Sequence, residues 1–174
     1  MALNRSPAVA PAHDFEDVRG YVLDDADEQE LLLRQIECTF SWSRRDGHPF
    51  GVVMNYVFLD GRFWLTASRM RKRVSAVQRD PRVCIAISSR GSGIAARRSI
   101  SYARSCTVHD DAETLHWFYP RFAAAMRPDD PDRAAEFVRL LDSPNRVVFE
   151  VVPERRVGYD GAKMWAAAPS AAPA

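Results

Sequence analysis

The chain has 174 residues, of which 47% are hydrophobic and 27% are charged, and its formal net charge at pH 7 is +1. This length fits a single domain with a proper buried core. A net charge so close to zero gives no bulk electrostatic reason to expect nucleic acid or a membrane surface as a partner. No signal-peptide pattern and no apolar run of roughly 18 residues is present, so we expect a cytoplasmic protein without a membrane span.

The cysteines indicate a reduced core rather than a metal site. Cys38, Cys84 and Cys106 all stand in apolar surroundings, and none has Cys-X-X-Cys or Cys/His spacing. An odd number of buried thiols is typical of a protein from a reducing compartment. We therefore expect no disulfide and no metal.

Both ends of the chain have the composition of tails. Residues 1–13 are rich in proline and alanine, and residues 166–174 read AAAPSAAPA. Such segments rarely contribute to a packed core. We expect flexible tails over residues 1–20 and 164–174, flanking one domain over residues 21–163.

The first half of this domain predicts a helix followed by an antiparallel meander. Asp24–Asp27 can cap a helix, and the segment EQELLLRQIE places its leucines on one face. Cys38–Ser43 alternates apolar and polar residues, as a half-buried strand does. Phe50–Leu59 is an almost continuous apolar run, which predicts a strand covered on both faces. Turns with Asp-Gly chemistry, at Arg45–Gly47 and Asp60-Gly61, join these strands to Arg62–Thr66.

The second half continues with strands and helices in turn. In chain order, we expect a helix from about Met70 to Gln78, a strand at Arg82–Ser88, a glycine-bearing loop at 89–98, a strand at Ser99–His109, helices from Asp110–Asp111 and at about Asp132–Leu141, and a strand at Asn145–Val157. Closure removes exposed strand edges. The pattern therefore predicts a mainly β fold with helices, a six-stranded antiparallel split β-barrel.

The most informative stretch is residues 63–83, FWLTASRMRKRVSAVQRDPRV. We expect the strand to end at Leu65–Thr66 and the turn Ala67–Ser68 to open a helix that begins with Arg69, Arg71, Lys72 and Arg73. Cations at a helix start are disfavoured by a few tenths to about 1 kcal/mol each, because the N–H groups there are already positive. A bound phosphate reverses that effect. The stretch thus indicates an anion site beside two hydroxyls, although a solvated basic face would have the same composition.

Over residues 28–161 the chain resembles the pyridoxamine 5'-phosphate oxidase-like flavin-binding split barrels, including their deazaflavin-using relatives. The most specific part is Thr66 followed six residues later by Lys72, with Arg71 before it and Arg-Asp-Pro-Arg-Val at 79–83. The resemblance implies that these Thr, Arg and Lys residues hold a cofactor phosphate, and that the preceding segment lies against the ring system. It also implies a homodimer with two sites at the interface, and FMN or the deazaflavin coenzyme F-420 as cofactor. The cofactor-binding residues that it implies are Asn55, Leu65, Thr66, Ala67, Ser68, Arg69, Arg71, Lys72 and Arg73.

One departure from the family pattern bears on the cofactor. The phosphate oxidases proper carry an Arg and a Lys on the strand before this motif, whereas Val52–Tyr56 holds no cation. This weakens assignment as a true pyridoxamine phosphate oxidase. It leaves room for the deazaflavin coenzyme, whose lactyl-oligoglutamate tail needs cations spread over a distance. Arg69, Arg73 and Arg97–Arg98 are the candidates for that tail, and both cofactors stay open.

These observations predict a flavin- or deazaflavin-dependent oxidoreductase that acts on a small molecule. No catalytic acid or base stands out, which agrees with a reaction whose chemistry belongs to the cofactor. The alternative is a non-enzymatic flavin-binding carrier or sensor. Tyr159 and Trp165 follow the last strand, where relatives place residues near the ring.

Overall fold

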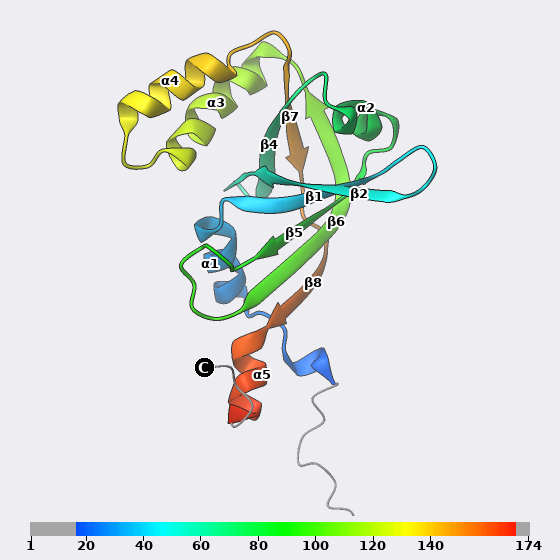
Figure 1. The fold of residues 1–174 in the computed structure, drawn as a ribbon, viewed down its shortest axis with the longest axis vertical. Helices are drawn as coiled ribbons and strands as arrows, with labels where there is room; N and C mark the ends of the chain where they lie inside the picture. Colours follow the sequence, from blue (N-terminus) through cyan, green and yellow to red (C-terminus); the bar gives the residue numbers. More distant parts are fainter. Residues whose placement is uncertain (1–16, 170–174) are drawn as a thin grey trace, which may run out of the picture.

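The computed structural model describes residues 17–169 (Figure 1). Of the expected tails, residues 1–16 and 170–174 lie outside this described part. The helices are η1 (Val18–Gly20), α1 (Asp25–Arg34), α2 (Lys72–Arg79), α3 (Ala112–Met126), α4 (Pro131–Leu141) and α5 (Gly161–Ala167). The strands are β1 (Glu37–Ser43), β2 (Pro49–Asn55), β3 (Val57–Leu59), β4 (Arg62–Ser68), β5 (Arg82–Ser88), β6 (Arg98–His109), β7 (Arg146–Val151) and β8 (Arg155–Asp160).

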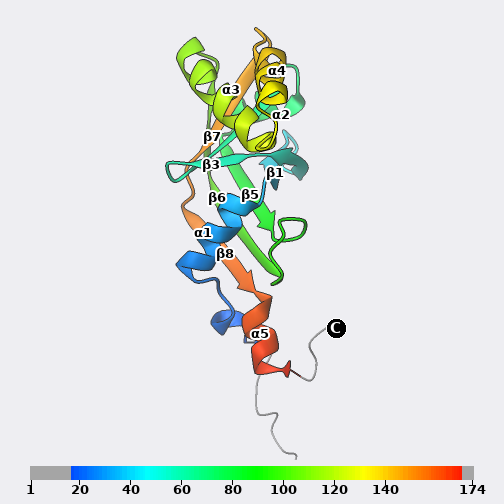
Figure 2. The same cartoon turned by 90° about the vertical axis from the view of Figure 1, so that its left-hand side faces the viewer.

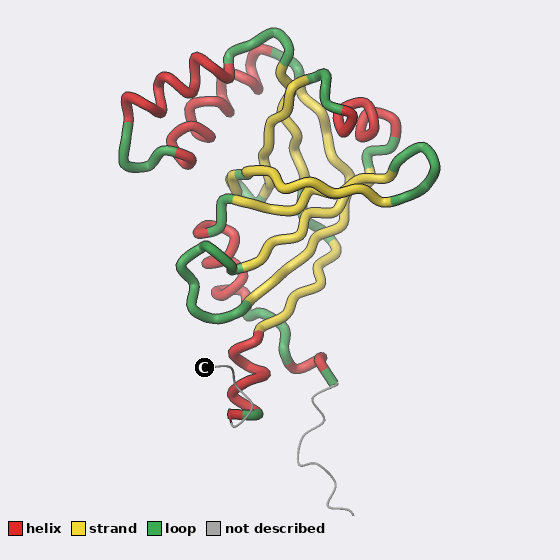
Figure 3. The backbone as a smooth tube through the Cα atoms, in the orientation of Figure 1, coloured by secondary structure: helices red, strands yellow, loops and turns green. Residues whose placement is uncertain are grey.

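The strands form one curled antiparallel sheet in the order β2-β1-β5-β6-β7-β4-β3, with β8 paired to β6. Its two ends belong to one segment, because only Tyr56 separates β2 from β3. Residues 49–55 of that segment pair with β1, and residues 57–59 pair with β4. The backbone that runs from β2 into β3 therefore joins the two edges of the sheet and closes the barrel (Figure 3). The structure therefore confirms the predicted split barrel, with β2 and β3 together counted as one of its six strands.

The strand predicted at Asn145–Val157 is in fact two strands. β7 ends at Val151 and β8 begins at Arg155, and both pair with successive parts of the long strand β6. Pro153 lies in the break, where its missing N–H cannot join a ladder. The interruption lets the chain leave the barrel wall and follow β6 toward the opposite end of the molecule (Figure 2).

The expectation that Phe50–Leu59 is covered on both faces is wrong for β2 within a single chain. Met54 points into the core, but Val53, on the opposite face of the strand, is 67% exposed. Residues of a strand alternate between its two faces, so an apolar run fills a core with only every second side chain. The outer face of β2 is left uncovered by residues 17–169.

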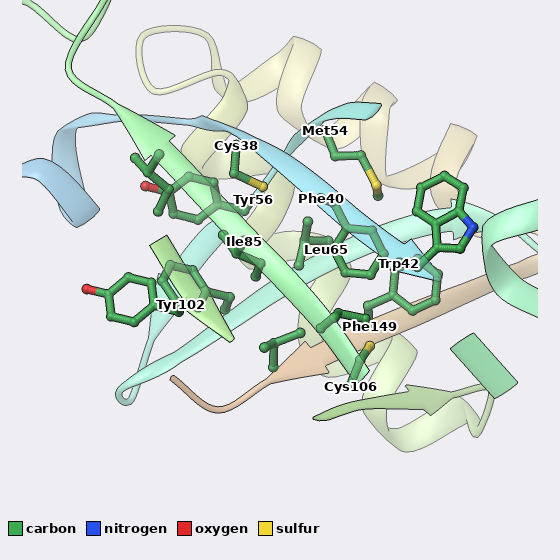
Figure 4. Close-up of a cluster of buried hydrophobic side chains, with 14 of the residues drawn as sticks. Cys38, Phe40, Trp42, Met54, Tyr56, Leu65, Ile85, Tyr102, Cys106 and Phe149 are labelled. Carbon is green, nitrogen blue, oxygen red and sulfur yellow. The ribbon is translucent and has the colours of Figure 1, made fainter. Parts of the chain in front are cut away.

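The core occupies the inside of the barrel (Figure 4). Phe40 and Phe149 stack there at 5.3 Å between ring centroids, and neither is exposed to solvent. Two thiols, Cys38 and Cys106, share this interior as unpaired cysteines, and burial raises the pKa of each to about 12. Cys84 is only partly buried. A second apolar cluster lies outside the barrel, where α3 and α4 cover Trp64 of β4 and Val148 of β7.

The two ends of the described chain are joined at the pole opposite α3 and α4. Arg98 of β6 forms ion pairs of 2.8 Å with Asp27 and with Glu30 of α1, and it lies 3.6 Å from Asp160, the N-cap of α5. Lys163 of α5 forms a further ion pair with Asp24 at 2.7 Å. These contacts fix α5 against the segment that leads into α1.

Replacing Phe149 by alanine tests the core. The change removes a fully buried ring that stacks on Phe40, and we expect the free energy of unfolding to fall by about 3–5 kcal/mol. The matched control is Leu33→Ala on α1, because Leu33 is 59% exposed. That control should change the free energy by no more than about 0.5 kcal/mol in the same urea titration. Equal losses for both variants would contradict the assignment of the core.

Candidate functional site

The junction between β4 and α2 differs in detail from the sequence prediction. β4 continues to Ser68 instead of ending at Thr66, and α2 begins at Lys72 with Arg71 as its N-cap. The strand is longer because Ala67 and Ser68 still pair with β7, and the backbone N–H of Arg69 donates to Asn145 O at 2.7 Å just beyond it. Only Lys72 and Arg73, and not all four cations, therefore lie in the first helical turn.

Alternation along β4 divides the predicted site residues between two faces. Leu65 and Ala67 are buried in the core, at 0% and 2% exposure, so only their backbones can face a ligand. Thr66 and Ser68 point outward. The hydroxyl of Thr66 donates to Val147 O at 2.9 Å, and that of Ser68 accepts from the N–H of Met70 at 3.4 Å. The hydroxyls thus lie on one face beside the start of α2.

The start of α2 is an uncapped positive end. Arg71 makes no side-chain capping bond, and the first turn contains no acidic residue. The first N–H groups of the helix therefore have no capping acceptor, and the helix dipole places a partial positive charge at this end. Both features favour a bound anion at this place.

Arg73 gives the clearest indication of an anion site at this junction. Its Nε is buried and has no hydrogen-bond partner in residues 17–169. Burial, followed by the positive charge of Arg71, lowers the pKa of this guanidinium, which nevertheless stays charged at neutral pH. A buried, charged donor without an acceptor costs free energy that an anion would recover. The side chains present thus fit a phosphate group.

The other cations around the junction differ in how they are neutralised. Arg69 forms an ion pair with Asp110 at 2.9 Å, whereas Arg71 and Lys72 are exposed and form no ion pair within the described part of the chain. Arg146 lies opposite Ser68 in the β4–β7 register and also has no acidic partner there. Several positive charges without internal partners therefore gather beside the hydroxyls.

Asn55 is placed differently from the other predicted site residues. It ends β2, and its side-chain amide donates to Ile36 O at 3.3 Å, in the chain that leads into β1. The whole of β2 pairs with β1, whereas the partners of β4 are β3 and β7. The structure thus gives no direct contact between Asn55 and the start of α2.

Sequence reasoning missed a polar network on the same outer face. Glu150 of β7 is only 9% exposed, and it contacts His109 Nε2 at 2.7 Å and also pairs with Arg62. Burial alone would raise the pKa of Glu150, but His109 and Arg62 together bring it below the usual value. His109, Val148 and Thr66 form one row across β6, β7 and β4, so the network lies on the same face of the sheet as the Thr66 hydroxyl, with β7 between His109 and Thr66. Strand alternation puts Glu150 on the outer face, but it does not reveal the two partners.

The residues expected near a ring or a cofactor tail belong to elements other than β4 and α2 of the same chain. Tyr159 is on β8, where its hydroxyl contacts Met164 Sδ at 3.0 Å, and Trp165 is on α5. Arg98 is engaged by the carboxylates of α1, so it is not free to read a tail. Within residues 17–169 there is no cluster of His, Cys, Asp and Glu that could hold a metal, and no helix is long and apolar enough to cross a membrane.

Comparison with known proteins identifies the family. The model of the pyridoxamine 5'-phosphate oxidase family matches residues 25–157. The chain belongs to this family. A search of curated proteins found no match. The family match covers every strand of the barrel and the whole junction between β4 and α2.

Solved structures show the same split-barrel fold. A conserved hypothetical protein from Mycobacterium tuberculosis superimposes with a TM-score of 0.72 at 21% identity, over 84% of this chain and 90% of that one. An FAD-binding protein from Mesorhizobium loti gives 0.59 at 14% identity, over 80% and 96%. An F420 reductase gives 0.55 at 14% identity, over 78% and 98%. At these identities the likeness establishes the fold of the family and not a shared activity.

The ion pair between Arg69 and Asp110 predicts the effect of Asp110→Asn. Removing this carboxylate leaves Arg69 unneutralised beside the other cations, so inorganic phosphate should bind the junction about two- to fivefold more tightly at low salt. Isothermal titration of the chain without cofactor measures this. The control is Asp46→Asn in the β1–β2 turn, which removes the partner of Arg44 and should leave phosphate affinity unchanged. A weaker affinity in Asp110→Asn would show that Asp110 positions Arg69 for the anion.

Proposed function

We propose that the chain is a flavin- or deazaflavin-dependent oxidoreductase that acts on a small molecule. The observation that carries the proposal is the buried Nε of Arg73, which lacks a partner at the uncapped start of α2. A phosphate supplies the missing acceptor. FMN and the deazaflavin coenzyme F-420 both offer one, and membership of the pyridoxamine 5'-phosphate oxidase family makes them the leading candidates.

The roles of the chain's own residues follow from their positions. Arg71 and Lys72 neutralise the phosphate from the solvent side, while Arg73 donates from the buried side. The hydroxyls of Thr66 and Ser68 offer further bonds on the outer face of β4. A bound flavin or deazaflavin would supply the hydride transfer, and the protein contributes binding, orientation and exclusion of water.

The charges also bear on which cofactor binds. Of the cations expected to read a long anionic tail, Arg69 is paired with Asp110 and Arg98 is paired with Asp27 and Glu30. Arg73 and Arg97 remain without acidic partners in residues 17–169. A tail would therefore have to displace Asp110 from Arg69, whereas one compact phosphate needs only the start of α2. Both cofactors satisfy the phosphate site.

The deciding experiment identifies the chromophore. The protein is purified, denatured and analysed for the absorbance and mass of any released molecule, and colourless preparations are titrated with FMN and with F-420. Binding of either supports the proposal, and binding of neither overturns it. Turnover of the bound cofactor by a reductant then separates an oxidoreductase from a carrier or sensor, in which the cofactor would stay in one redox state.

Lys72→Ala tests the phosphate site directly. It removes one charge-assisted bond, which is worth about 1.5–3 kcal/mol, so cofactor affinity should fall about tenfold or more. The matched control is Lys163→Ala on α5, because Lys163 pairs with Asp24, the N-cap of α1, and not with the junction. Fluorescence or absorbance titration measures both. An unchanged dissociation constant in Lys72→Ala would refute the placement of the phosphate.

We also propose that the chain forms a homodimer through the outer face of β2, β1 and β5. This face consists mainly of small or uncharged residues, namely Thr39, Ser41, Gly51, Val53, Cys84 and Ala86. Gly51 keeps the face flat, because a Cβ there would lie 2.9 Å from the Ser41 hydroxyl. The charged residues of this face, Glu37 and Arg82, begin the antiparallel strands β1 and β5 and so lie at its two opposite ends. A face with a largely uncharged centre is typical of an obligate interface.

Val53→Asp tests the dimer. Val53 is 67% exposed in the single chain, so the variant should fold, but a buried carboxylate would oppose association. We expect light scattering at micromolar concentration to give a dimer for the natural chain and a monomer for Val53→Asp. The matched control is Leu140→Asp on α4, where the side chain is 68% exposed, and this variant should stay dimeric. A natural chain that is monomeric under these conditions would disprove the proposal.

A further inference from the structure

Both ring nitrogens of His109 face a carboxylate. His109 ends β6 on the outer face of the barrel, where its Nε2 lies 2.7 Å from Glu150 Oε2 and its Nδ1 lies 3.7 Å from Asp111 Oδ2. The side chain is 23% exposed, so protons from the solvent reach it. No other histidine in residues 17–169 has a ring nitrogen within 4.0 Å of an acidic oxygen. A ring placed in this way responds to pH through two neighbours at once.

The contacts specify which nitrogen of the neutral ring carries the proton. Glu150 is ionised at neutral pH, because its pKa lies below the usual value, and a carboxylate only accepts hydrogen bonds. Nε2 of His109 is therefore the donor, and Nδ1 presents a lone pair to Asp111. The Asp111 carboxylate is held there, because it caps α3 by accepting from the N–H of Thr114 at 2.8 Å. Protonation of Nδ1 thus turns a repulsive contact into an attractive one.

The ring belongs to a group of charges that we call the His109 cluster. Besides the imidazole, it contains three carboxylates and two guanidinium groups, those of Asp110, Asp111, Glu150, Arg62 and Arg69. Arg62 pairs with Glu150, and Arg69 pairs with Asp110 at 2.9 Å. Asp111 pairs only with the imidazole, and within residues 17–169 no further charged side chain pairs with the cluster. The cluster is therefore net negative when the ring is neutral and balanced when the ring is protonated.

The His109 cluster lies close to the anion site at the start of α2. Asp110 follows His109 in the chain, and its partner Arg69 belongs to the junction between β4 and α2. α2 and α3 also lie at the same end of the barrel (Figures 1 and 2). In the row across β6, β7 and β4, one strand separates His109 from Thr66, so their backbones are about 10 Å apart. At that separation one charge still changes the potential at a bound anion, most strongly at low ionic strength.

We infer that protonation of His109 tightens anion binding at the start of α2, so that this site takes up an anion and a proton together. The inference rests on the phosphate site proposed above and adds its regulation. Histidine is the side chain that ordinarily changes charge between about pH 5 and pH 8. Because linkage is reciprocal, a bound anion also favours the protonated ring by the same factor. A cofactor held by its phosphate is then bound more tightly in mildly acidic than in mildly alkaline solution.

Sulfate is the probe that tests this coupling, because its own charge is constant in this range, whereas phosphate titrates within it. The full chain without cofactor is titrated by calorimetry at low salt, at about pH 5.5 and about pH 8. We expect sulfate to bind about three- to tenfold more tightly at the lower pH. His109→Gln keeps a neutral donor and should reduce this difference to less than about twofold. The matched control is His116→Gln on α3, an exposed histidine, which should keep the natural difference.

A second measurement uses the natural chain alone and tests the reciprocal effect. The ring signals of the histidines are followed by NMR across the same pH range, with and without saturating sulfate. Sulfate should move the midpoint of the His109 titration to higher pH, by about half a unit to one unit if the affinity changes three- to tenfold. The midpoint of His116 should move much less. A merely structural role of His109 would not produce this shift.

The outcomes separate the inference from the proposed function. Absence of sulfate binding at both pH values would remove the anion site itself, and the inference with it. Sulfate that binds equally tightly at both pH values would leave the site in place and refute the role of His109. The same conclusion would follow if His109→Gln, with a natural melting temperature, kept the full pH dependence, or if sulfate left the His109 midpoint unchanged.

Discussion

The barrel depends on one run of chain that hydrogen-bonds to two different strands. Residues 49–55 pair with β1 and residues 57–59 pair with β4, and Tyr56 is the point of exchange. Its N–H donates to Ile36 O at 2.9 Å, and its hydroxyl donates to Leu32 O at 3.1 Å. The side chain is 1% exposed, and burial raises the pKa of the phenol. Tyr56 is thus fixed through its side chain by α1 and through its backbone by Ile36, the residue before β1.

Closure of the barrel determines where the charged junction lies. Because β3 pairs with β4 on one side, β4 has β7 on the other, and that pairing extends to Ser68. The extension carries the chain past the barrel wall before α2 starts. It also aligns Thr66 with Val148 and His109 across neighbouring strands. A core that requires Leu65 and Ala67 inside therefore forces the hydroxyls and the cations to the outside.

The sequence predicts much of this fold because its signals are local. Asp60 and Gly61 adopt positive φ, at 51° and 73°, as an Asp-Gly hairpin turn requires. The cations around Lys72 mark the anion site for a similar reason, since a helix start and its charges are adjacent in sequence. The end of β4 could not be predicted in this way, because it depends on pairing with β7 far along the chain. The partners of Glu150 come from two other strands, and no periodicity specifies them.

The exposed face of β2 shows a further limit of the sequence. The sequence shows that Val53 is apolar, and alternation along the strand gives the face on which it lies. Neither tells whether the surface that would cover this face belongs to the same chain or to another. Similarly, the sequence shows Arg97 and Arg98 as equivalent neighbours. In the structure, Arg98 pairs with two carboxylates of α1, whereas Arg97 forms no ion pair within residues 17–169. The functional difference between two identical residues arises only when the strands assemble.

The contacts of α5 have a consequence for folding. Lys163 and Asp24 are 139 residues apart in sequence, and the N–H of Asp160 donates to Tyr21 O at 2.6 Å. Arg98 links the same two segments from the middle of the chain. A contact between the first and last elements closes a loop of almost the whole chain. The entropic cost of closing that loop is lowest once the chain between the two elements is already ordered. This pole of the molecule should therefore close late in folding, and during synthesis it must wait until α5 has left the ribosome.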